Sequence, residues 1–127
     1  MDVAISYSRP MRVLLGVLGL GPRWTRLVVD DADVEIHMGW AFQARFPRAA
    51  VVAVRPWPTG RRRPASRGAH GWGGRWLVNG SADGLVVVTI DPVARARTIG
   101  FPVKLRELTV SVTDPDALVG GLSAGAR

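Results

Sequence analysis

Hydrophobic and polar residues alternate along several short segments, which is the pattern of β-strands with one buried face. Leu27 and Val29 belong to the first such segment, and Ile36 lies at the centre of the second. Phe42 and Phe46 lie on one face of the third, and a β-branched run follows it. We therefore predict four consecutive strands at residues 26–30, 34–38, 42–46 and 51–55.

Turn-forming residues separate these strands. The segment Asp30-Asp31-Ala32-Asp33 predicts a tight turn, because aspartate tolerates left-handed backbone and hydrogen-bonds to nearby amides. Gly39 ends the second strand and Pro47 the third. The three carboxylates of the first turn are oxygen ligands for a hard cation, but they lack the longer loop and distal glutamate of a calcium site. We predict an acidic turn and no metal.

The second half of the chain predicts three more strands and one helix. Residues 85–91 are apolar on both faces, which favours a central strand that is covered on each side. Asp114 and Pro115 are typical of a helix N-cap and first helical position. Leu118 and Leu122 lie one turn apart and should face the sheet. The expected elements are strands at 75–79, 85–91 and 105–112, an irregular connection at 93–102, and a helix at 114–122.

Arginines are concentrated in the middle of the chain. The net charge is +7. No Asp or Glu occurs between Ile36 and Ala82, whereas eight arginines fall from Arg45 to Arg75. This segregation indicates a positive face with an anionic partner. Arginine-rich composition from GC-rich codon usage is the alternative explanation.

Residues 58–74 are rich in Gly, Pro and Arg and have no apolar periodicity, so they predict a long loop. Arginines beside exposed tryptophan can bind nucleic acid, anionic membrane or an acidic protein surface. A solvated loop with its tryptophans at the barrel rim is the alternative. The candidate partner-binding residues are Arg61, Arg62, Arg63, Arg67, His70, Trp72 and Arg75.

The N-terminal region predicts a flexible segment over residues 1–10, followed by a single domain at 11–127 whose core covers about 24–122. Residues 11–20 are the most apolar run, but they have about half the length of a membrane span. We expect a strand or short helix that covers the sheet. Exposure of this run would favour a membrane-tethered adaptor, and packing on the sheet would favour a soluble module.

No catalytic or cofactor signature is found. The chain has no cysteine, which excludes disulfides and thiol chemistry. Neither His37 nor His70 lies in a pattern that assembles a nucleophile, a base and an orienting acid. A dinucleotide-binding glycine motif lies after a strand and at the start of a helix. Gly16, Gly19 and Gly21 do not have this context, so we predict no such motif. We expect no enzyme activity, no cofactor and no metal.

Seven strands in a four-plus-three arrangement closed by one C-terminal helix resemble the pleckstrin-homology-like superfamily. The stretch RLVVDDADVEIHMGWAFQARFPRAAVVAV is similar to bacterial members, of the small actinobacterial type, and VVVTIDPV with LTVSVTDPDALVGGL is similar to their C-terminal end. The resemblance covers roughly residues 24–122. It implies a mainly β, seven-stranded barrel or sandwich of two antiparallel sheets, closed by the helix and lacking catalytic activity. The family's lipid-binding members have a basic first hairpin loop, whereas Asp30–Asp33 is acidic, which argues against phosphoinositide binding there.

These observations predict a non-catalytic binding module that engages a protein partner or an anionic surface through its arginine-rich loop. An accessory nucleic-acid-binding protein that uses the same loop is the alternative. We expect a cytoplasmic protein, and peripheral attachment to the membrane is the alternative.

Overall fold

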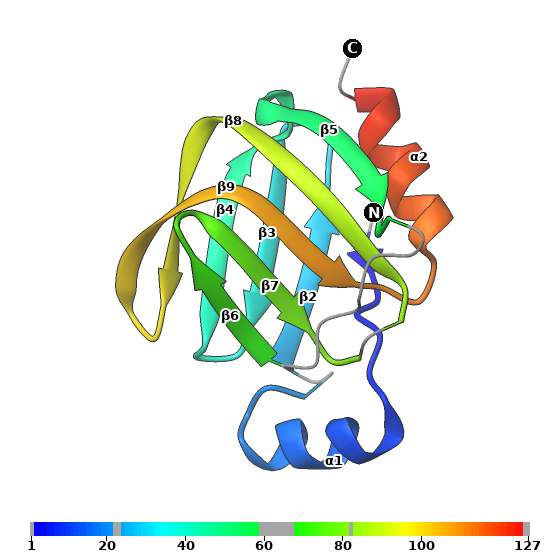
Figure 1. Cartoon of the computed structure of the whole chain (residues 1–127), viewed down its shortest axis with the longest axis vertical. Helices are drawn as coiled ribbons and strands as arrows, with labels where there is room; N and C mark the ends of the chain where they lie inside the picture. The colour runs from blue at the N-terminus through cyan, green and yellow to red at the C-terminus, as the bar shows by residue number, and fades with distance from the viewer. Residues whose placement is uncertain (1, 22–23, 59–67, 82, 126–127) are drawn as a thin grey trace.

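The computed structural model describes residues 2–21, 24–58, 68–81 and 83–125. Within these ranges the chain forms nine strands and two α-helices, and the sheet curls into a half-barrel with a helix at its C-terminal end (Figure 1). The strands are β1 (Asp2–Val3), β2 (Thr25–Val29), β3 (Asp33–Met38), β4 (Phe42–Pro47), β5 (Val51–Pro56), β6 (Gly68–Trp72), β7 (Arg75–Asn79), β8 (Leu85–Thr98) and β9 (Phe101–Ser111). The helices are α1 (Arg9–Val17), the 3₁₀ helix η2 (Arg48–Ala50) and α2 (Pro115–Gly125).

The described strands form one sheet in the order β1-β2-β3-β4-β8-β9-β7-β6, and β5 pairs with β8. All pairs are antiparallel except β7 with β9, which are parallel. The expectation of a mainly β fold with a closing C-terminal helix is confirmed. The strand count differs: each of the seven predicted segments forms a strand, but β1 and β6 are additional, and one sheet replaces the expected two.

Strand β8 is long and bent, and it belongs to both parts of the curled sheet. Its first half pairs with β5, its second half pairs with β4, and β9 runs beside both halves with a register shift between Thr89 and Ala94. The prediction of an irregular connection at 93–102 was wrong, because the strand continues past Pro92, which falls within this bulge. A tight turn at Ile99 and Gly100, both with positive φ, then leads into β9.

The core lies on the concave side of the sheet. The predicted inward side chains of β3 and β4 are buried, and Phe42 contacts the Trp76 ring with centroids 5.4 Å apart. Thr109 and Ser111 are polar residues of β9 that are also buried. The N-terminal segment covers this part of β9, where the Ser111 hydroxyl donates to the Ser6 carbonyl (2.9 Å) and accepts from the Gly80 amide (3.0 Å). The Ser111 hydroxyl is tolerated inside because it both donates and accepts a hydrogen bond.

Residues 1–10 were predicted to be flexible, whereas residues 2–8 run along the sheet. β1 pairs with β2, Ile5 is buried, and isolated bridges join Ile5 to Val112 and Tyr7 to Gly80. The Tyr7 hydroxyl donates to the Leu20 carbonyl (2.7 Å), and burial raises the pKa of Tyr7. The N-terminal segment is therefore part of the folded domain.

Helix α1 was expected to cover the sheet, but it lies at one end of the half-barrel (Figure 1). Leu15 is its buried residue, while Val13, Leu14 and Val17 are exposed. The apolar run at residues 11–20 is therefore divided, because Leu15 and Leu20 are buried whereas Val13, Leu14, Val17 and Leu18 are exposed. In the described part of the chain, no helix has both the length and the apolar character needed to cross a membrane.

Helix α2 begins and packs as the sequence predicts. The Ala117 amide donates to the Asp114 carboxylate (3.1 Å), and Leu118 and Leu122 are buried. The Arg48 guanidinium donates to the Gly121 carbonyl in the last part of the helix and to the Asp30 carbonyl (3.0 Å). Arg48 therefore joins α2 to the β2–β3 turn, and its charge favours a helix C-terminus.

Asp114→Ala is expected to lower the free energy of unfolding by about 1 kcal/mol, because the substitution leaves a helix amide without its cap. Asp116→Ala, which also removes a carboxylate from the first turn but no observed cap, is the matched control. Chemical denaturation measures both. If Asp114→Ala and Leu118→Ala each unfold like the unmodified protein, α2 is not docked on the sheet.

Candidate anion-binding face

The convex face of the sheet carries ordered rows of polar side chains, because directly paired residues of neighbouring strands point to the same side. The first row, read across β2, β3, β4, β8 and β9, consists of Arg26, His37, Gln43, Arg97 and Pro102. The second row pairs Glu35 with Arg45 and, across β8 and β9, Arg95 with Lys104. Lys104 is exposed, as are Arg45 and Arg95.

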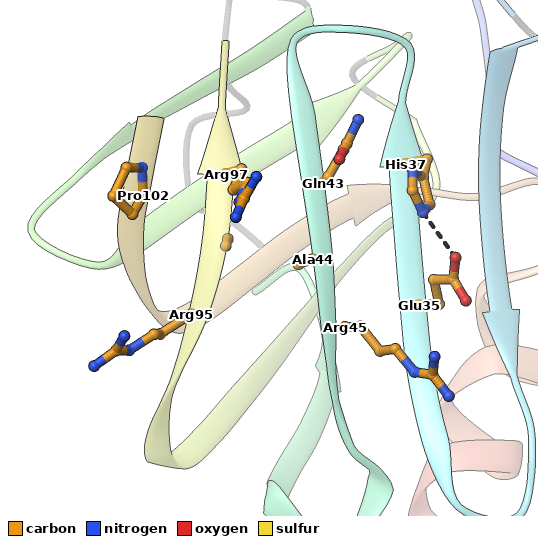
Figure 2. Close-up of a pocket in the computed structure, with 9 residues that line it drawn as sticks. Glu35, His37, Gln43, Ala44, Arg45, Arg95, Arg97 and Pro102 are labelled. Atoms are coloured by element: carbon orange, nitrogen blue, oxygen red, sulfur yellow. Dashed lines mark hydrogen bonds and ion pairs between the residues drawn. The ribbon is translucent and has the colours of Figure 1, made fainter. Parts of the chain in front are cut away.

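A hollow opens on this face where β4 and β8 separate. Their ladder has only two residue pairs, Gln43 with Arg97 and Ala44 with Ala96, because β8 then bends at its bulge and β4 ends at Pro47. The side chains of Ala44 and Ala96 are buried in the hydrophobic core, on the other face of the sheet. The hollow has a volume of about 410 Å³ (Figure 2) and is lined by Glu35, His37, Gln43, Ala44, Arg45, Arg95, Ala96, Arg97 and Pro102. We call it the β4–β8 groove.

Two of the charged side chains at the groove are already paired. Glu35 Oε1 lies 2.7 Å from His37 Nε2, and Arg45 Nη2 donates to Asp33 Oδ2 over 2.9 Å. The Asp33 carboxylate raises the pKa of the Arg45 guanidinium by this hydrogen bond and by its charge. Both pairs are partly exposed, so they contribute little to stability. Glu35 is therefore engaged with His37, and Arg45 with Asp33.

Arg95 and Arg97 form no hydrogen bond or ion pair with any residue in the described ranges. Figure 2 shows Arg97 beside Gln43, and Arg45 and Arg95 turned toward opposite sides, which leaves the space between them open. A guanidinium presents a planar fork of donors that matches a carboxylate or phosphate. The groove therefore offers two uncommitted cations to an oxyanion.

The described polar side chains that line the groove are three arginines, one histidine, one glutamate and one glutamine. His37 with Glu35 resembles a base with its orienting carboxylate, and no described Ser, Thr, Cys, Lys or Tyr lines the groove beside them. Across the part of the chain that the structure describes, no three His, Cys, Asp or Glu side chains are close enough to hold a metal ion.

The structure describes only part of the sequence-predicted site. Arg61, Arg62, Arg63 and Arg67 lie outside the described residues. His70 and Trp72 belong to strand β6, where a long loop was predicted, and exposed Arg75 begins β7. Because β9 and β7 separate β6 from β8, the structure does not bring these strand positions to the groove.

Sequence reasoning missed Arg95 and Arg97. Their signal was the alternation of Ala94, Arg95, Ala96 and Arg97, which is a strand pattern with its charged side chains on one face. Pro92 before it and Gly100 after it suggested a broken segment instead. The alternation alone would have placed both arginines on a common surface.

The chain matches no family model, no curated protein and no solved structure. Its function is therefore inferred from the geometry and charge of the described residues.

Proposed function

We propose that this protein is a non-catalytic binding module whose convex sheet face binds an acidic segment of a protein partner. The observation that carries the proposal is the pair of unpartnered arginines, Arg95 and Arg97, beside the open β4–β8 groove. The sequence resemblance to the pleckstrin-homology-like superfamily is consistent with a scaffold of this kind and stays a prediction. Three arginines and a glutamine among the described lining residues of the groove support a binding role.

The surroundings of the groove favour a protein segment over nucleic acid. Among the described residues, no Phe, Tyr or Trp lines it, whereas proteins that bind single strands stack the bases on aromatic rings. A second, mainly apolar hollow of about 310 Å³ lies where β4 and β8 diverge, lined by Pro47, Ala49, Ala50, Val93 and Ala94. A peptide can present an acidic side chain to the arginines and a small apolar one to this hollow. The arginine-rich loop stays a predicted second contributor of positive charge.

The test compares two double variants that remove the same charge. Arg95→Gln with Arg97→Gln changes the groove, and Arg55→Gln with Arg106→Gln changes two exposed arginines that do not line it. The probe is a fluorescein-labelled peptide of alternating glutamate and alanine, followed by fluorescence anisotropy. A hydrogen bond to a charged group contributes about 1.5–3 kcal/mol. The groove variant should therefore raise Kd by at least about tenfold, and the control should raise it by less than about threefold.

Three results would contradict the proposal. These are equal Kd values for the two double variants, equal binding of a lysine–alanine peptide, and tighter binding of a single-stranded oligonucleotide with a steep salt dependence, which would favour nucleic acid. Changing Arg61, Arg62 and Arg63 to Glu tests the loop separately. If that variant alone abolishes peptide binding, the loop is the site and the groove is not.

A further inference from the structure

Exposed apolar side chains gather at one end of the molecule, and they are different residues from those that line the groove. The structure describes ten large hydrophobic residues that are exposed, and eight of them belong to this end. Val17 is 82% exposed and Phe101 is 71% exposed. The other two, Val52 and Val93, lie on β5 and β8. The eight residues, which we call the apolar rim, are Val13, Leu14, Val17, Leu18, Trp24, Trp40, Ile99 and Phe101.

Hydrogen bonds connect the segments of the rim. The Trp40 indole donates to the Leu18 carbonyl (2.6 Å), which joins the end of α1 to the β3–β4 turn. The Gly39 amide donates to the Trp24 carbonyl (2.9 Å), and the Ile99 amide donates to the Ala41 carbonyl (3.3 Å). The rim therefore runs from α1 through the two tryptophans to the turn between β8 and β9.

Helix α1 turns its apolar face outward. Val13 and Val17 lie one turn apart, as do Leu14 and Leu18, so these four side chains share one face. Leu15 lies on the other face and is buried. Figure 1 shows α1 outside the curled sheet, and it makes few contacts with any strand. An exposed apolar patch of this kind marks an interaction site.

The charges around the rim are basic. Arg9 and Arg12 are exposed on α1, and exposed Arg26 follows Trp24 by two residues. The acidic turn Asp30–Asp33 lies at the opposite ends of β2 and β3 from the two tryptophans. An apolar helix face with arginine beside it and tryptophan at its edge is the pattern of segments that lie in the interface of an anionic membrane.

We infer that the apolar rim docks on an anionic lipid bilayer, with α1 lying in the plane of the headgroups. Nine residues of helix extend about 14 Å, which is too short to cross a hydrocarbon core of about 30 Å. A second copy of this chain fits the rim less well, because a two-fold interface would oppose Arg9 and Arg12 to like charges. The rim is distinct from the β4–β8 groove, so membrane docking does not depend on the groove.

The test is sedimentation of the full chain with vesicles of phosphatidylcholine alone, or of phosphatidylcholine with phosphatidylserine. The unmodified protein should sediment with the anionic vesicles only. Val13→Ser with Val17→Ser should lower the partition coefficient at least about tenfold, because two exposed valines no longer enter the bilayer. The control, Val52→Ser with Val93→Ser, makes the same change at the two exposed valines outside the rim and should bind like the unmodified protein.

Two further measurements locate the contact. Bromine-labelled lipid should quench tryptophan fluorescence, and Trp40→Phe should remove part of that quenching. Arg9→Gln with Arg12→Gln should weaken binding to anionic vesicles, and the loss should shrink as salt is raised. Phe101→Ser repeats the apolar test on another element, and circular dichroism checks that each variant is folded.

The inference is overturned if the unmodified protein does not sediment with anionic vesicles, or if the rim variants bind as well as their control. It is also overturned if the rim variants abolish a dimer in solution while vesicle binding is absent, since a second copy would then occupy the rim. The groove's peptide assay is independent of these outcomes, so either proposal can fail without the other.

Discussion

Val88→Asp is expected to abolish cooperative folding. Val88 is 2% exposed on β8, where it pairs with Val54 of β5 and Leu108 of β9. A carboxylate buried there has no cation to pair with, and an uncompensated buried charge costs about 3–5 kcal/mol or more. That loss is comparable with the whole stability of a typical domain, about 5–15 kcal/mol.

The matched control is Val52→Asp on the neighbouring strand β5. Val52 is 53% exposed, so the same carboxylate stays hydrated and should change stability by less than about 0.5 kcal/mol. Circular dichroism and thermal melting compare the two. A cooperative Val88→Asp melt within a few degrees of the Val52→Asp melt would mean that β8 is not the central strand.

Gly84→Ala is expected to lower the free energy of unfolding by about 2–5 kcal/mol, from left-handed backbone strain together with a steric overlap. Gly84 has a φ of +66°, and a Cβ atom there would come closer than 3.0 Å to the Val112 carbonyl oxygen. The Val112 amide also donates to the Gly84 carbonyl (2.9 Å). Relief of the overlap would therefore disturb the end of β9 where it leads into α2.

Gly100→Ala separates these two causes. Gly100 has a φ of +80°, but no atom lies within 4 Å of the place where its Cβ would be. Alanine there should cost only the conformational term, about 1–2 kcal/mol. Chemical denaturation of both variants measures the difference, which is the energy of the overlap at Gly84. Equal losses would show that the turn at Gly84 does not approach Val112 closely.

The positive charge of the proposed binding surface could be expected from the sequence, but its proposed location could not. Charge segregation in the sequence points to the segment around Arg61, because consecutive arginines are conspicuous there. Arg95 and Arg97 are separated from each other by alanine, and they gain importance only where β4 and β8 diverge. The divergence depends on a β-bulge in β8, which is defined by the pairing of β8 with β9. A local sequence pattern therefore does not predict it.

The apolar run at residues 11–20 shows the same limit. Its composition is equally compatible with packing on the sheet and with contact to a membrane. The choice depends on Tyr7, Leu20 and Trp40, whose hydrogen bonds hold the helix at the end of the half-barrel. These partners come from three separate parts of the chain, so their meeting is a property of the tertiary structure.

The sequence by itself determined the seven predicted strands, the acidic turn at Asp30 and the capped helix at Asp114. Alternation, turn chemistry and capping act over a few residues, so they survive without knowledge of the rest of the fold. Only the tertiary structure decided the strand order, the parallel pairing of β7 with β9, the burial of Ser111 and the exposure of Val17. Each of these features depends on which distant segment covers a given face of the sheet. The free energy of burying apolar surface is gained only when those segments come into contact in the folded chain.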